Sequence, residues 1–83
     1  MKWTKEDDIV LVSYIFQATH SGSSLIKAYK LASFKLGRSI SACESRWQKR
    51  ISKNYDFTRK GSKDYISPIK FSQWLIKIAS ENK

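Results

Sequence analysis

Apolar side chains recur every three or four positions in four stretches of the chain, which is the spacing of one face of an α-helix. The first stretch, residues 3–19, opens with Thr4 as a helix cap and Asp7 three positions later. Acids crowd its first turn, where the helix dipole favours them. The apolar stripe consists of Leu11 and Ile15, with Trp3, Val12 and Ala18 as further candidates. The run HSGSS then ends the pattern.

Two more helices are predicted in the middle of the chain. Residues 24–37 predict the second, which Ser24 can cap and Gly37 can end. Its stripe contains Leu25, Ala28, Tyr29, Ala32 and Leu36. Residues 38–55 predict the third, whose stripe contains Ile40, Cys43, Trp47, Ile51 and Tyr55. We expect Trp3, Tyr29 and Trp47, and the thiol of Cys43, to lie in the core.

A polar stretch and a fourth helix complete the chain. Residues 56–66 form a polar loop that contains the basic run RKGSK, and Ser67 with Pro68 then opens a helix as cap and first helical residue. The stripe of this helix is Phe71, Trp74, Leu75 and Ile78. Such a stripe is too apolar to face water on an isolated helix. It either packs onto its own chain or pairs with a second copy in a homodimer.

The charge of the chain is concentrated in its middle. The 83 residues are enough for one domain, near the lower limit for a self-sufficient core. Residues 25–63 contain eleven Lys and Arg against two acids, which equals the whole net charge of +9. This surplus favours a polyanionic partner. With one cysteine, no signal-peptide pattern and no apolar run as long as a bilayer, the expected place is a reducing cytoplasm rather than a membrane.

Residues that could carry out catalysis are scarce. The chain has one histidine, His20, one cysteine and no glycine-rich phosphate loop, so no pairing of a nucleophile with a base is visible. His20 has no second metal ligand near it in the sequence. We therefore expect no enzymatic activity, no metal and no cofactor.

The third predicted helix combines a tight turn before it with basic residues, as in helix-turn-helix proteins. Opposite its apolar stripe lies a row of polar side chains: Ser41, Glu44, Ser45, Gln48 and Ser52. Most are short enough to approach base edges in a major groove. Cations flank the row where phosphates would lie, namely Arg46, Lys49, Arg50 and Lys53.

Two stretches of the sequence resemble a Myb/SANT repeat. WTKEDD at residues 3–8 is similar to the opening of such a repeat, and YKLASFKLGRSISACESRW at residues 29–47 is similar to its end. Tyr29 stands where the middle tryptophan of the repeat falls, and the interval from Trp3 to Tyr29 is longer than usual. With this longer connection the chain resembles the Myb-like prespore regulators of sporulating bacilli and their phages, over about residues 3–55.

The resemblance implies an all-α fold with a three-helix Myb/SANT-like helix-turn-helix domain at residues 1–55. A basic loop at 56–66 and a C-terminal amphipathic helix at 67–83 would follow it. The implied function is sequence-selective binding of double-stranded DNA by the third helix, as a small bacterial or phage transcription regulator. The alternative is a SANT-type protein-interaction module, such as a phage-encoded inhibitor of a host protein. In the family, the positions of Ser41, Glu44, Ser45 and Gln48 face bases.

Three side chains stay open between two roles. Arg38 could reach a phosphate or be solvated, and Arg46 could reach a phosphate or, as the resemblance suggests, pair with Glu6 or Asp7. Glu44 either closes a capping box at Ser41 or, with Ser39 as the cap, is free to accept a hydrogen bond from cytosine. The candidate DNA-binding residues are Arg38, Ser41, Glu44, Ser45, Gln48, Lys49, Arg50, Ser52 and Lys53.

Overall fold

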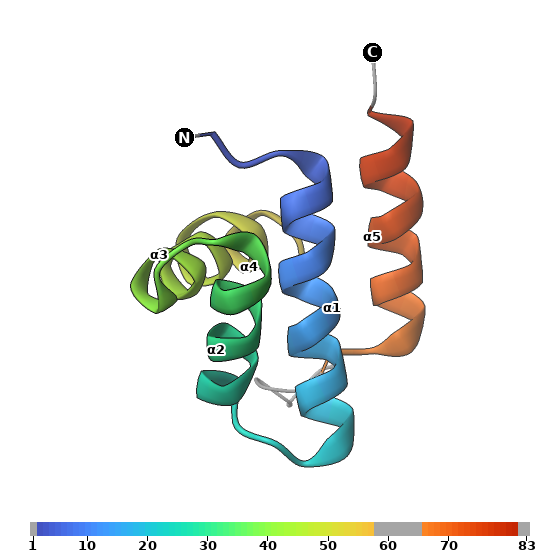
Figure 1. Ribbon diagram of the computed structural model, residues 1–83. Helices are drawn as coiled ribbons and strands as arrows, with labels where there is room; N and C mark the ends of the chain where they lie inside the picture. The colour runs from blue at the N-terminus through green and yellow to red at the C-terminus, as the bar shows by residue number, and fades with distance from the viewer. Residues whose placement is uncertain (1, 58–65, 82–83) are drawn as a thin grey trace.

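The computed structural model describes residues 2–57 and 66–81, and these residues are predominantly helical (Figure 1). No β-strand is present in the described part of the chain, so the predicted all-α class is confirmed. The elements in chain order are α1 (Lys5–Ser21), α2 (Leu25–Leu36), α3 (Ile40–Ser45), the π-helical turn η1 (Arg46–Ile51), α4 (Ser52–Asn54) and α5 (Pro68–Ser80).

Helix α1 is the centre of the arrangement. It lies between α2 on one side and α5 on the other, and the α3–α4 stretch crosses α2 at a steep angle (Figure 1). No helix in the described residues is both long and apolar enough to span a bilayer.

The helices begin at caps that the local sequence predicts, but two of their ends differ: α1 runs through His20 to Ser21, and α5 ends at Ser80. The amide of Asp7 donates to Thr4 Oγ1 over 3.0 Å, and the amide of Thr4 donates to Asp7 Oδ2 over 3.2 Å, which completes a capping box. Ser24 and Ser67 cap α2 and α5 through their hydroxyl oxygens. Gly37 ends α2 with a φ of 69°, a left-handed conformation that side chains with a Cβ rarely adopt.

One hydrophobic core is shared by α1, α2, α3, η1 and α5. The predicted stripes supply most of it: Leu11, Val12, Ile15, Ala18, Ala28, Tyr29, Ala32, Cys43, Trp47, Ile51, Trp74 and Ile78 are buried. Six further stripe residues are half-buried and pack against this core: Trp3, Leu25, Leu36, Tyr55, Phe71 and Leu75. The placement of Trp3 in the core was therefore wrong in part. Ile40, at the first position of its helix, is 41% exposed, because one end of a helix overhangs the surface that it packs on.

The third predicted helix contains a π turn. Cys43, Trp47 and Ile51 are four residues apart, whereas four residues of an α-helix overshoot a full turn by about 40°. Over two such steps the stripe would rotate away from the core. In η1 the amide of Ser52 donates to the carbonyl of Trp47, five residues back, so the wider turn takes more residues per revolution. The π turn therefore keeps all three side chains buried.

The predicted polar loop contributes two buried side chains that the helical pattern did not reveal. Phe57 is 1% exposed and Ile66 is 2% exposed. The Phe57 ring lies 5.3 Å from the Trp47 ring and 5.4 Å from the Trp74 ring, between centroids, so it fills the space between η1 and α5. The amide of Ser67 donates to the Phe57 carbonyl over 2.8 Å and holds the two ends of the loop together. The basic run at residues 59–63 lies outside the described residues.

Helix α5 packs onto its own chain. Its Phe71 ring stacks on Phe16 of α1 with 4.6 Å between centroids, and Trp74 and Ile78 are almost fully buried. Of the two arrangements considered for this stripe, packing onto its own chain is the one that the structure has. A homodimer through this helix stays a prediction, but burial of the stripe no longer requires one.

Candidate nucleic-acid interface

The polar row of the third predicted helix faces solvent. Ser41, Glu44, Ser45 and Gln48 are exposed on α3 and η1. Ser52 is half-buried, and its hydroxyl donates to the carbonyl of Gln48, within the same helix, over 3.5 Å. The flanking cations Lys49, Arg50 and Lys53 are exposed, and none forms an ion pair with a described residue. We call the exposed residues Ser41, Glu44, Ser45 and Gln48 the reading face.

The cap of α3 decides whether Glu44 closes a capping box at Ser41. Ser39 is the N-cap, because its hydroxyl oxygen accepts a hydrogen bond from the amide of Ala42 over 3.0 Å. The capping box at Ser41 is therefore excluded. The Glu44 carboxylate instead accepts a hydrogen bond from Gln48 Nε2 over 3.3 Å, one turn along the helix. Glu44 and Gln48 thus present one linked polar surface to solvent.

Arg46 pairs with an acid of α1, but not with either of the two acids that were predicted from the sequence. Its guanidinium donates to both carboxylate oxygens of Asp8, over 2.9 and 2.8 Å. The prediction of Glu6 or Asp7 as its partner was wrong. Glu6 is exposed, and Asp7 is held by the capping box, whereas Asp8 is 7% exposed and faces η1. The bidentate geometry fixes the start of α1 against η1.

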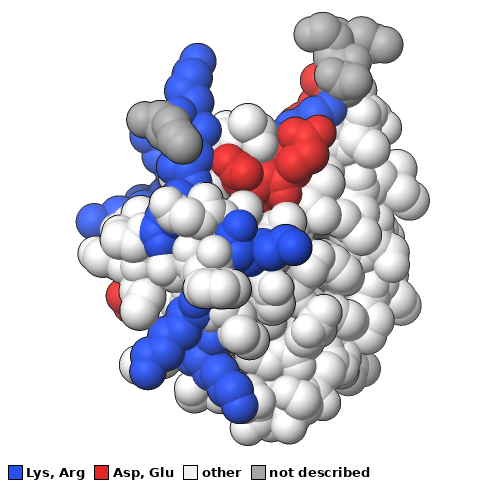
Figure 2. All heavy atoms as spheres, viewed as in Figure 1, with Lys and Arg blue, Asp and Glu red and all other residues white. Residues whose placement is uncertain are grey.

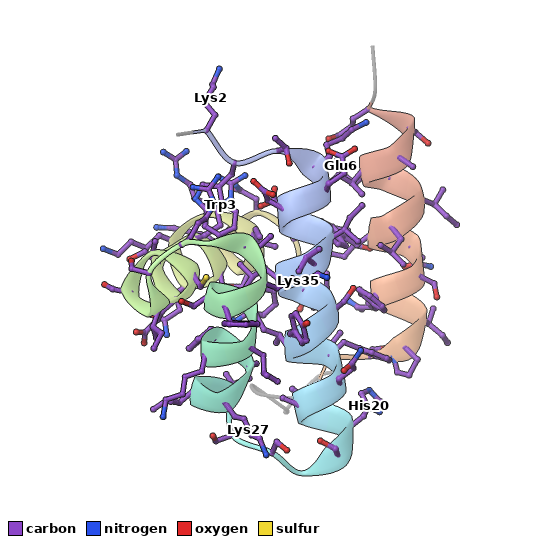
Figure 3. All side chains as sticks on the ribbon, viewed as in Figure 1. Lys2, Trp3, Glu6, His20, Lys27 and Lys35 are labelled. Carbon is purple, nitrogen blue, oxygen red and sulfur yellow. The ribbon has the colours of Figure 1, made fainter. Side chains whose placement is uncertain are left out.

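Arg38 has an environment that neither of its two alternatives described. Its Nη2 donates to Asp7 Oδ2 over 3.0 Å and to the carbonyl of Lys2 over 2.8 Å. Its guanidinium lies 4.2 Å from the centroid of the Trp3 ring, which half-buried Arg46 approaches to 5.5 Å. Only 11% of the Arg38 side chain is exposed, so this cation holds the N-terminal segment in place. Trp3 lies over the α3–α4 stretch as a result (Figure 3).

The Arg38–Asp7 pair makes a pH-dependent contribution to stability. The hydrogen bond from Arg38 holds the pKa of Asp7 below its ordinary value. A lowered pKa means that the folded state prefers the carboxylate, so its contribution is complete above about pH 5 and is lost as pH falls through the folded pKa. Replacing Asp7 by Asn should lower the melting temperature at pH 7, and the difference from the wild type should shrink on acidification. A difference that is the same at pH 7 and pH 3 would contradict the assignment. Glu6→Gln, an exposed acid in the same turn, is the control.

A hollow of about 330 Å³ opens beside the reading face. Its lining combines the Trp3 ring with Ser45 and with the cations Arg46, Lys49 and Arg50. The sequence predicted Trp3 in the core and did not predict its position at the edge of this hollow. The signal that could have found it is its position two residues before a helix start, where a large ring is free to lie over a neighbouring element. The hollow has the size and charge to receive a phosphate or a sugar.

The charges divide the visible surface into two parts. Lys and Arg side chains gather over α2 and the α3–α4 stretch, whereas the surface over α5 is mostly uncharged in this view (Figure 2). The acids at the start of α1 form a small patch, and Asp7 and Asp8 in it are paired with Arg38 and Arg46. The visible positive side of the molecule therefore includes the α3–α4 stretch, which carries the reading face.

Within the described residues, no group of three or more His, Cys, Asp or Glu side chains comes together as a metal site. Cys43 is fully buried, and this burial raises the pKa of its thiol. His20 Nε2 donates to the carbonyl of Ile66 over 2.9 Å and so helps to anchor the end of the loop.

No protein-family model matches the chain, and no curated protein or solved structure matches it either.

Proposed function

We propose that this protein binds double-stranded DNA in a sequence-selective way, with the helix that starts at Ile40 in the major groove, as a small bacterial or phage transcription regulator. One observation carries the proposal. The reading face is exposed and uncharged except for Glu44, and three exposed cations without ion pairs in the described chain lie beside it. Short polar side chains suit base edges, and flanking cations suit phosphates.

The paired arginines support the same proposal. Arg38 and Arg46 neutralise Asp7 and Asp8 at the start of α1, so these acids would repel a phosphate backbone less. This pairing divides the basic residues into two groups. Arg38 and Arg46 stabilise the fold, whereas Lys49, Arg50 and Lys53 are available to DNA. Arg38, a candidate for phosphate contact, would then act through the position of Trp3.

The π turn lies within the proposed interface. Gln48, Lys49 and Arg50 all belong to η1, so the wider turn sets how far they project relative to Ser41 and Ser45 on α3. Arg50 also borders a second hollow of about 370 Å³, which it shares with Lys77 and Glu81 at the end of α5. Lys49 and Lys53 are therefore the better residues for a test of phosphate contact.

A single reading helix contacts a short site, which seldom supplies enough affinity for regulation. Additional affinity would come from a homodimer, from a host protein partner, or from the basic run at residues 59–63. DNA selected from a random pool at a stated salt concentration would supply the preferred site.

The decisive experiment compares two kinds of variant on the selected site and on random DNA. The double variant Ser45→Ala/Gln48→Ala should weaken binding to the selected site by about 1–3 kcal/mol for each base that is no longer recognised, and should leave random binding almost unchanged. Lys49→Ala or Lys53→Ala should weaken both and lower the salt slope by about one unit. Lys77→Ala on α5, where Lys77 pairs with Glu81 over 2.7 Å, serves as the control.

Two outcomes would overturn parts of the proposal. If Ser45→Ala/Gln48→Ala keeps its full preference for the selected site in fluorescence anisotropy, the reading face is wrongly assigned. If the wild-type protein has no salt-dependent affinity for DNA at all, DNA binding is rejected, and the protein-interaction module takes its place.

A further inference from the structure

Helix α2 exposes three large apolar side chains. Ile26 is 60% exposed, Leu31 is 46% exposed and Phe34 is 91% exposed. A solitary exposed apolar side chain is common on protein surfaces, but three on one twelve-residue helix are unusual. The helix contributes Ala28, Tyr29 and Ala32 to the core from its opposite side, so these three side chains are not needed for the packing of the domain.

Lysines are interspersed among these apolar side chains. Lys27, Lys30 and Lys35 are exposed on α2, and none forms an ion pair with a described residue. Lys27 and Lys35 lie toward opposite ends of the helix (Figure 3). Eight residues separate them, which is about 12 Å along the axis.

The surface between α1 and α2 is hollowed rather than flat. Tyr14 and Gln17 line two adjacent hollows of about 220 and 90 Å³. Val10 and Lys35 also line the larger hollow, and Lys27 and Leu31 also line the smaller one. We call these six residues the α1–α2 seam. No residue of the reading face lines either hollow.

We propose that the α1–α2 seam, together with Phe34, which neighbours Leu31 three positions along α2, binds an acidic amphipathic helix of another protein. Its apolar side chains would meet Tyr14, Leu31 and Phe34, as an amphipathic helix fits a groove. Its carboxylates would meet Lys27 and Lys35, one at each end. Charge complementarity favours this occupant, because Lys27 and Lys35 form no ion pair with a described residue.

The same observations argue against three other occupants. A second copy would bring the same lysines face to face in a chain of net charge +9. The flat surface of a bilayer would not fill the two hollows. DNA would place its charged phosphates against the apolar ring of Phe34, which is unfavourable. The proposal goes beyond DNA binding and does not depend on it, since it uses different residues.

The test starts from an unbiased library of random peptides, from which the protein selects binders. The enriched peptides should have apolar residues at helical spacing and an excess of Asp and Glu. The best one is synthesised, and its affinity is measured by fluorescence anisotropy. Leu31→Ser and Phe34→Ser should each weaken it about tenfold or more, the effect of losing an interface anchor. Lys27→Glu/Lys35→Glu should weaken it as well.

Ile76→Ser on α5 removes an equally apolar side chain that is 68% exposed, and it should leave the affinity unchanged. Circular dichroism checks that each variant is folded. The proposal is overturned if no peptide is enriched, if the enriched peptides lack acids, or if Phe34→Ser binds them as well as the wild type does. Binding to vesicles rich in phosphatidylglycerol that depends on Phe34, without binding to peptides, would also overturn it, because the occupant would then be a membrane. A lower salt slope for DNA in Lys27→Glu/Lys35→Glu, like the one expected for Lys49→Ala, would overturn it too, because these lysines would then contact DNA. Failure of DNA binding alone would leave the peptide result intact.

Discussion

Replacing Phe57 by alanine is expected to cost about 3–5 kcal/mol of the free energy of unfolding, although the residue lies outside every helix. Its ring is 1% exposed and contacts the rings of Trp47, Tyr55 and Trp74. Truncation would leave a cavity between η1 and α5 that the surrounding helices can close only in part. Urea denaturation, followed by circular dichroism, measures the loss.

Phe34→Ala is the matched control for this prediction. It deletes the same atoms from a ring that is 91% exposed, so the free energy of unfolding should change by at most about 0.5 kcal/mol. Equal losses in the two variants would mean that the Phe57 ring is not in the core. In that case α5 would be held by its contacts with α1 alone.

Trp47→Ala is expected to unfold the protein or nearly so. Trp47 is 8% exposed, lies in the middle of the stripe from Cys43 to Ile51, and packs against Phe57. The expected cost is about 3–5 kcal/mol. At the usual 0.05–0.15 kcal/mol per residue, a chain of this length has roughly 4–12 kcal/mol in total. A domain near the lower size limit for a self-sufficient core is expected at the low end of this range, where the loss leaves little stability or none.

Thermal melting of Trp47→Ala and Trp47→Phe tests this expectation. Trp47→Phe keeps an aromatic ring in the site and should retain a cooperative transition at a lower temperature than the wild type. A near-native melting curve for Trp47→Ala would show that the third helix is rotated from the orientation described. The double variant Trp47→Phe/Phe57→Leu should deviate from additivity, because the two rings are in contact.

The helices could be predicted from the sequence because their signals are local. Thr4, Ser24 and Ser67 cap helices through atoms three residues away, and Gly37 ends one by its own backbone conformation. The stripes were predictable because burial repeats with the period of the helix. Exposure of the reading face follows from the same period, since it lies opposite Cys43 and Trp47.

Interactions between distant segments could not be predicted in this way. Arg46 pairs with Asp8 across 38 positions, and Arg38 pairs with Asp7 across 31. Three consecutive acids, Glu6 to Asp8, carry the same charge, and only the rotation of α1 against η1 decides which one each arginine reaches. Glu44 was undecided because Ser39 and Ser41 are both able to cap, and the start of α3 at Ile40 selects Ser39.

The sequence by itself determined the all-α class, the four helical segments, most of the core and the positive side of the protein. Each of these depends on side chains within a few residues of one another or on composition. The tertiary structure alone decided that Phe57 and Ile66 are buried, that a π turn keeps Ile51 in the core, and that α5 covers its stripe on its own chain. The physical reason is that burial outside a regular helix has no period. It depends on which surfaces meet when the chain folds.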